Sequence, residues 1–353
     1  MNLFFKEVKM SNEEITVEIS TKNRYYTTLP LCLAGIANQS YSPKKVIIFD
    51  DGEQEDLRKN PTYASLFNLF NSKNIGIEVI FGNKKGQVHN HQAALDIIDT
   101  EWIWRIDDDD IPEYNALELM VKNIKDDVGA ISGLIIDPSA PKFDSTVASS
   151  NIEDIFIKPN IQWSRFSNIA DVDHINNSFL FRRSASKHGY CMELSPVGHR
   201  EETLFTYGIK LQGYRLLIDP KVIIWHCRSP VGGIRSYEHT FFWEHDERIF
   251  RNKLKEYGVL ENKLIVLDNG LGDHYAFRSI LSEVKGKYRD LILAVCYPEV
   301  FEEENVQLIS IQEAGQYMID KEKQNVYKWM MEHKWKKSIV EAYRKMFVCS
   351  EDL

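Results

Sequence analysis

The sequence predicts an α/β protein with a mainly parallel sheet flanked by helices, followed by a small C-terminal α/β module. Strand-like and helix-like segments alternate through the first 110 residues, the pattern of parallel sheets with crossover helices. Two of the strands end in aspartates, and open α/β sheets bind ligands at the carboxyl ends of their strands. At 353 residues the chain is long enough for about two domains, which we expect at residues 1–250 and 260–353.

The composition indicates a globular protein of the cytoplasm. Hydrophobic residues make up 43% of the chain and charged residues 27%, and apolar runs stop short of the roughly 20 residues of a membrane helix. The chain does not open with the pattern of a secretory signal, so we expect a cytoplasmic location. The five cysteines form no CxxC pair, which argues against a disulfide framework or a zinc cluster. A net charge of -9 argues against a general polyanion-binding surface.

The elements of the first domain follow from the hydrophobic period and from the turn residues between them. The predicted order is strand, helix, strand, strand, helix, strand, at residues 15–21, 27–40, 44–52, 75–82, 87–98 and 102–106. The second of these strands ends in acid and glycine, and the last one leads into an acidic run. Further strands are expected at residues 129–137 and within 173–185.

Four consecutive aspartates, Asp107 to Asp110, follow the apolar strand at residues 102–106. Like charges this close repel one another, so they need water or a cation. One explanation is a solvated turn, because acidic runs are usually exposed. The other is a metal site, since two aspartates one residue apart at a strand end can hold a hard divalent cation through oxygen ligands. A metal at this edge implies a phosphate-bearing substrate.

Over about the first 228 residues, four motifs in order resemble those of family 2 glycosyltransferases of the GT-A fold. The matching residues are Thr21, Asn23 and Arg24 after the first strand, Asp50 and Asp51 after the second, Asn90 in the second helix, and Asp107, Asp108 and Asp109 as the Asp-x-Asp motif. Asp110 follows as the common third acid. Ser20 stands where the family usually has proline, and the motif order makes the resemblance specific.

A fifth segment, His199 to His226, resembles the family's Glu-Asp-x-x-Leu segment followed by Gly-Tyr, a strand containing proline, and a histidine. The resemblance places Glu201 at the glutamate position and Glu202 at the aspartate position. His226 ends an apolar strand, where a neutral imidazole would complete a metal shell. The alternative for His226 is a strand-end histidine that bonds to the backbone.

The resemblance implies an inverting transferase that moves a sugar from a nucleoside diphosphate sugar, first of all a UDP-sugar, to an acceptor hydroxyl of a glycan. It implies Mn²⁺ or Mg²⁺ held by Asp109, His226 and Asp107, and a general base at Glu202 or else Glu201. The implied donor-binding residues are Thr21, Asn23, Arg24, Asp50, Asp51, Asn90, Asp107 and Asp108. Trp163 and Phe166 are candidates for the acceptor site, because aromatic faces stack on sugars and bases.

After residue 262 the sequence predicts strand, Gly-rich turn, helix, strand and strand. The GLGD turn weakly resembles the opening of heptosyltransferase-like GT-B enzymes, but the donor-binding half of such an enzyme is missing, so we expect an accessory module. Residues 321–345 are predicted as a basic helix region with interleaved aromatics.

Two alternatives remain open. The first is transfer to modified DNA, with Lys334, Lys336 and Lys337 as phosphate contacts. The second, from another class, is a non-catalytic module that binds a sugar nucleotide or a glycan. The sequence makes no prediction about the oligomeric state.

Overall fold

The computed structural model describes residues 13–139, 148–149, 151–156, 168–229, 231–234, 240–259, 263–288, 290–317 and 324–349. The chain divides into two compact units, one formed by Met1–Ser150 with Asn160–Leu254 and the other by Asn151–Pro159 with Lys255–Leu353. Each helix in the described part of the chain is too short or too polar to cross a membrane.

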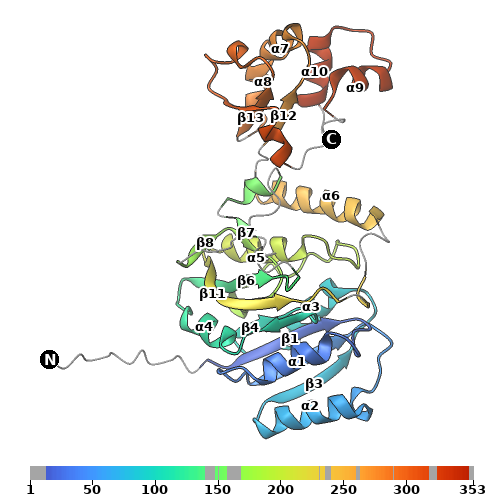
Figure 1. Ribbon diagram of the computed structural model, residues 1–353, viewed down its shortest axis with the longest axis vertical. Coiled ribbons are helices and arrows are strands. Elements are labelled where there is room, and N and C mark those ends of the chain that lie inside the picture. Colours follow the sequence, from blue (N-terminus) through green and yellow to red (C-terminus); the bar gives the residue numbers. More distant parts are fainter. Residues whose placement is uncertain are drawn as a thin grey trace, which may run out of the picture. The chain divides into compact units, whose positions relative to one another are not determined.

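The first unit is built on a nine-stranded mixed sheet in the order β3-β2-β1-β4-β10-β6-β11-β5, with β8 paired to β11 (Figure 1). Its strands are β1 Ile15–Thr21, β2 Lys45–Asp50, β3 Gly76–Phe81, β4 Trp102–Arg105, β5 Asp110–Pro112, β6 Val128–Ile136, β8 Ala170–Val172, β10 Phe179–Arg182 and β11 Arg215–His226. Strands β1 to β4 are parallel, and β10 is antiparallel to β4 and β6. A small second sheet pairs β7 (Ala148–Ser149) with β9 (His174–Ile175). The prediction of a mainly parallel sheet flanked by helices is confirmed.

Helices cover both faces of this sheet. They are α1 Leu29–Ala37, α2 Pro61–Ser72, α3 Gln87–Ile97, α4 Ala116–Lys122, α5 Glu201–Lys210 and α6 Thr240–Glu256. Buried residues of α1, α2 and α4 form one apolar core with Val17 of β1 and Trp104 of β4. Because side chains alternate along a strand, Glu18 and Arg105 point to the other face, where they meet His91 of α3 and Glu201 of α5. The polar side of the sheet therefore lies under α3 and α5.

The expected element order lacked one helix. Helix α2 lies between β2 and β3, where the sequence reasoning placed two strands in succession. The two strands are parallel, and parallel strands need a long crossover connection, usually a helix. The start of α2 has a local signal, because the Asn60 side chain accepts a hydrogen bond from the Thr62 backbone and Pro61 occupies the first turn.

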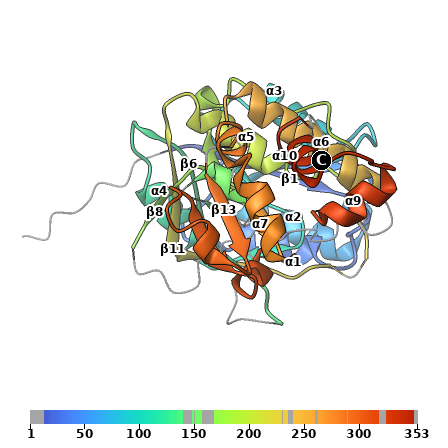
Figure 2. The ribbon, with the colours of Figure 1, turned by 90° about the horizontal axis from the view of Figure 1, so that it is seen from above.

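The second unit contains a three-stranded parallel sheet in the order β12-β13-β14. Its elements are β12 Lys263–Leu267, α7 Leu271–Arg278, α8 Leu281–Lys285, β13 Leu291–Val295, β14 Gln307–Ser310, α9 Val326–Glu332 and α10 Ile339–Phe347. Phe277 of α7 and Leu293 of β13 belong to one buried cluster, and Figure 2 shows this helix beside the strand. The predicted turn between β12 and α7 is present.

The basic helix region predicted at residues 321–345 is interrupted. Helix α9 ends at Glu332 and α10 begins at Ile339. Lys334 has a positive φ of 49°, and a residue in this conformation cannot be part of a right-handed helix. Ser338 is the N-cap of α10 and forms a capping box with Glu341. The lysines at 334, 336 and 337 therefore lie on an exposed connection and not on one helical face.

Candidate active site

The acids predicted at strand ends meet at one edge of the sheet. Because β1, β2 and β4 are parallel neighbours, their carboxyl ends lie side by side, with Thr21 and Asp50 as register partners. The acidic run follows β4 at the same edge. Thr21 donates a hydrogen bond of 2.6 Å to Asp108, which joins the first strand to the run. The aspartates therefore point into a polar site and do not form a simple solvated turn.

Arg24 supplies a counter-charge to the run. Its Nη1 atom contacts the Asp108 carboxylate and lies 3.0 Å from Asp109 Oδ2. Burial raises the pKa of Asp108 to about 7, although Arg24 and the hydrogen bond from Thr21 act in the opposite direction. Asp109 also accepts a hydrogen bond from the backbone N–H of Ser229 at 3.1 Å. The loop after β11 is thus joined to the acidic run.

Asp109, Asp110 and His226 form a cluster whose ligand atoms all lie within 4.8 Å of one another. His226 and Asp110 are register partners of β11 and β5, and His226 Nδ1 lies 2.8 Å from Asp110 Oδ1. Ser178 donates to the same carboxylate, and its hydroxyl also accepts from the backbone N–H of Asp107. Burial lowers the pKa of His226, but the hydrogen bond and charge of Asp110 outweigh it and raise the value to about 9.

The predicted donor-binding residues on β1, β2 and α3 are all present at the same edge. Asp50 accepts from the Tyr25 hydroxyl and the Gly52 backbone, and burial raises its pKa. Asp51 accepts from the backbone N–H groups of Lys84 at 3.0 Å and Gly86 at 2.8 Å. The loop before α3 is therefore held against the end of β2.

The two asparagines fix the ends of β1 and α3. Asn23 has a positive φ of 57° and accepts from the backbone N–H of Glu53 at 2.7 Å. Asn90 donates to the Ser20 hydroxyl at 2.9 Å. Ser20, which stands where proline is usual in the family, thus provides a polar contact that proline lacks.

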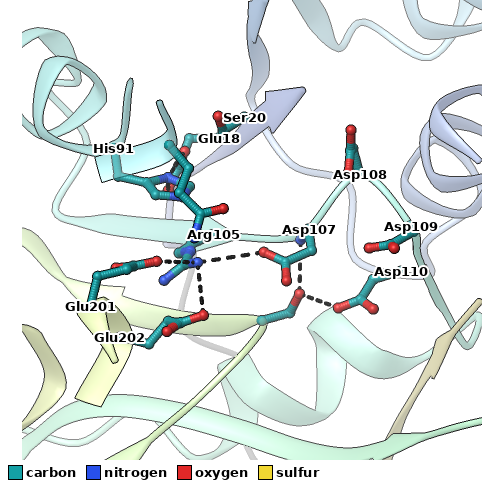
Figure 3. Close-up of polar contacts among 12 residues, drawn as sticks. Glu18, Ser20, His91, Arg105, Asp107, Asp108, Asp109, Asp110, Glu201 and Glu202 are labelled. Carbon is teal, nitrogen blue, oxygen red and sulfur yellow. Dashed lines mark hydrogen bonds and ion pairs between the residues drawn. The ribbon is translucent and has the colours of Figure 1, made fainter. Parts of the chain in front are cut away.

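The two candidate bases differ in exposure. The Glu201 side chain is fully buried, whereas 14% of the Glu202 side chain is exposed. Both contact the buried Arg105 of β4, whose Nη2 atom also lies 3.5 Å from Asp107 (Figure 3). Asp107 thus faces the glutamates, and the three-residue metal cluster found among the described residues does not include it.

The loop before α5 is fixed by a buried acid of α6. Asp246 accepts hydrogen bonds from the backbone N–H of Ser195 at 2.6 Å, from the Ser195 hydroxyl at 2.7 Å and from the backbone N–H of His199 at 2.9 Å. This loop leads into the first turn of α5, where Glu201 and Glu202 lie. Asp246 therefore anchors the start of the helix that carries the candidate base.

Three site residues were missed by the sequence reasoning: Arg105, Asp110 as a possible ligand, and Ser178. A signal existed for Arg105, because a lone arginine in the apolar strand WIWRI needs a buried carboxylate partner. Trp163 and Phe166, the predicted acceptor aromatics, fall outside the described residues.

A mainly parallel sheet with an acidic run at its carboxyl edge, facing a histidine and a pair of glutamates, is an arrangement suited to a glycosyltransferase. Residues 16–189 match the model of glycosyl transferase family 2. The match includes the motifs from β1 to the acidic run and ends before the segment from His199 to His226. A comparison with curated proteins finds no match.

Several solved structures are similar to the chain. S. aureus TarS shares 15% identity, with a TM-score of 0.49, over 94% of this chain and 50% of that one. The mannosyltransferase PcManGT from Pyrobaculum calidifontis, in complex with GDP-Man and Mn²⁺, shares 17% identity over 69% and 67%, with a TM-score of 0.46. GalNAc-T7 with UDP, GalNAc and Mn²⁺ shares 13% over 90% and 57%, with a TM-score of 0.49. The chain spans about half the length of the TarS chain.

Proposed function

We propose that the protein is an inverting, divalent-metal-dependent glycosyltransferase that moves a sugar from a nucleoside diphosphate sugar to an acceptor hydroxyl. One observation carries the proposal: Arg105 contacts both Glu202 and Asp107. A single guanidinium therefore connects a partly exposed glutamate to the acidic run. A transferase needs this proximity, because the proton acceptor and the diphosphate site must flank one anomeric carbon.

The residues present fit a divalent metal. Asp109, Asp110 and His226 offer two carboxylates and one imidazole whose ligand atoms all lie within 4.8 Å of one another. Oxygen-rich ligands with one histidine suit Mn²⁺, and the carboxylates suit Mg²⁺. When bound, such a metal would stabilise negative charge on the departing diphosphate as a Lewis acid.

The other residues at the edge would bind the nucleotide. We assign donor recognition to Thr21, Asn23, Arg24, Asp50, Asp51, Asn90, Asp107 and Asp108, which follow the ends of parallel strands or begin a helix beside them. UDP-sugars are the donor class we propose first. Arg24 is a cation beside the acids and has the guanidinium geometry that suits phosphate oxygens.

Glu202 is the proposed general base, and Glu201 is its buried neighbour. The acceptor oxygen attacks the anomeric carbon as Glu202 takes its proton, and the bond from that carbon to the phosphate oxygen breaks with its electron pair on the diphosphate. Attack on the face opposite the leaving group inverts the anomeric configuration. Glu202 is suited to this role because its side chain is 14% exposed, whereas that of Glu201 is fully enclosed. We propose a glycan hydroxyl as the acceptor.

The test begins with thermal-shift measurements using UDP-, GDP-, CMP- and dTDP-sugars, with and without Mn²⁺, on the parent and on Asp109→Ala. Stabilisation by one donor class that requires both Mn²⁺ and Asp109 supports the site. Proton NMR of the sugar released by hydrolysis then gives the anomer, and an α-linked donor should release a β-sugar. Tight, metal-dependent donor binding without any turnover would favour a non-catalytic binding module.

A further inference from the structure

A single buried arginine connects the two halves of the site. The Arg105 side chain is fully buried at the end of β4, and its Nη2 atom lies 2.6 Å from Glu201 Oε1 and 3.3 Å from Glu202 Oε1. The same atom lies 3.5 Å from Asp107 Oδ1 at the start of the acidic run. Figure 3 shows the guanidinium between the glutamates on one side and Asp107 on the other.

The partners of Arg105 are unlike those of a structural arginine. On the neighbouring strand β10, Arg182 donates from Nε and Nη2 to the backbone carbonyls of Val128 and Lys125, which tie strand ends together. In contrast, the Nε and Nη1 atoms of Arg105 have no hydrogen-bond partner among the described residues. The close charged contacts of Arg105 all go to carboxylates of the candidate site.

We propose that Arg105 is a positioning residue that holds Glu202 in the orientation of the general base, with Glu201 as the buried partner that keeps the guanidinium in place. The inference rests on the proposed function. Consecutive helix residues point about 100° apart, so Glu201 and Glu202 differ in exposure although both reach the Nη2 atom of Arg105. Glu201 points into the interior, and Glu202 is left at the edge with one oxygen on Arg105.

The two glutamates have different surroundings, because Glu201 is fully buried and Glu202 is 14% exposed. Burial raises the pKa of Glu201 well above the ordinary glutamate value, although the charge of Arg105 opposes this effect. Glu201 is the shorter ion-pair contact of the guanidinium, and Glu202 contacts the same Nη2 atom. Both glutamates also lie in the first turn of α5, where the helix dipole favours a negative charge.

The decisive variant is Arg105→Lys, which keeps the positive charge but removes the planar guanidinium whose Nη2 atom contacts Glu201, Glu202 and Asp107. We expect kcat for hydrolysis of the best-binding UDP-sugar, followed as UDP release, to fall about 100-fold, the scale of a misplaced catalytic group. The Mn²⁺-dependent thermal shift should stay within about twofold of the parent, because the charged contacts of Arg105 go to Glu201, Glu202 and Asp107 and not to Asp109 or His226. The donor KM should change less than kcat, although Arg105 also contacts Asp107 of the proposed donor site.

Arg182→Lys is the matched control, since it makes the same change on the adjacent strand away from the glutamates. We expect it to lower the melting temperature and to leave kcat of the folded protein unchanged. If Arg105→Lys behaves in the same way, with a lower melting temperature and an unaltered kcat, Arg105 is only structural and the inference is overturned.

A second measurement does not depend on turnover. In a crystal structure of Arg105→Lys, the Glu202 side chain should leave its rotamer while the acidic run stays in place. An unmoved Glu202 would contradict the positioning role even if kcat falls. A parent protein that neither binds nor hydrolyses any sugar nucleotide would instead refute the proposed function, so the two failures are distinguishable.

Discussion

The Nη1 atom of Arg24 lies 3.0 Å from Oδ2 of Asp109, so the acidic run has a counter-charge within the chain. Arg24 contacts Asp108 as well, and the side chains of all three residues are mostly buried. Four adjacent aspartates can therefore fold without a metal, because a guanidinium offsets part of their repulsion.

Arg24→Ala should destabilise the metal-free protein. Removal of one partner of a buried ion pair leaves the other charges uncompensated, which costs about 3 kcal/mol. We expect a lower melting temperature in EDTA and recovery of most of the loss with Mn²⁺, which would replace the missing positive charge. The measurement is a thermal unfolding series in both conditions, and an equal loss with and without Mn²⁺ would argue against metal binding at this run.

Asp110→Asn should weaken Mn²⁺ binding at least 10-fold, as Asp109→Asn should. Both carboxylates lie in the cluster with His226, and an amide is a weaker ligand for a hard cation than a carboxylate. Asp107→Asn is the control, because Asp107 faces Arg105 and should leave metal affinity within about twofold. Calorimetric titration with Mn²⁺ would measure the affinity of each variant. A large loss of affinity in Asp107→Asn would mean that Asp107 is a metal ligand, as the family resemblance implies.

Glu202→Gln should lower kcat at least 100-fold, since the amide cannot accept the acceptor proton. The donor KM should change little, because the base acts on the acceptor side. The melting temperature should also hold, because glutamine has the same shape and Arg105 keeps Glu201 and Asp107 as charged partners. Steady-state kinetics with the donor from the thermal-shift screen test this, and a kcat near the parent value would exclude Glu202 as the base.

His174 should make the protein acid-sensitive. It is fully buried on β9, and burial lowers its pKa from 6.5 to about 4, although the contact with Asn176 opposes the shift. Below pH 6.5 the unfolded chain binds a proton that the folded chain binds only near pH 4. The free energy of unfolding should therefore fall as the pH drops from 6.5 to about 4, by about 3 kcal/mol in total.

The measurement is urea unfolding at several pH values on the parent and on His174→Gln. The variant lacks the titrating ring, so its curve should be flatter across this range, whatever its absolute stability. Parallel curves for the two proteins would show that other groups cause the acid sensitivity.

Asp246→Asn should lower the free energy of unfolding by about 2 kcal/mol, because a charged acceptor of three hydrogen bonds becomes a neutral amide. Glu244→Gln, an exposed position on the same helix, is the matched control and should change little. If the two substitutions lowered the free energy of unfolding equally in urea, the contact between α6 and the loop before α5 would not stabilise the fold.

The sheet edge that carries the candidate site could be predicted from local patterns. Apolar runs that end in acid mark β2 and β4, and the parallel arrangement follows from the alternation with helices. The family resemblance supplied Glu201 and Glu202 at the start of α5 and His226 at the end of β11. These features depend on residues that are close together in the sequence, so they can be recognised without a structure.

The partners across the site could not be predicted. The pairing of Asp110 with His226 depends on the register of β5 against β11, over 100 residues apart. The contact of Arg105 with Glu201 depends on which face α5 covers. Helix α2 was missed although Asn60 and Pro61 mark its start, and the parallel direction of β2 and β3 requires a crossover there.

The pairing of Asp110 with His226 also bears on how long a bound metal would stay. Strand β5 has only three residues and lies at the end of the sheet order, where β11 is its one partner among the described strands. Short edge strands open more often than central ones, and each opening would separate these two ligands. The residence time of the metal should therefore follow the local opening rate of β5, which backbone hydrogen exchange at Ile111 would report.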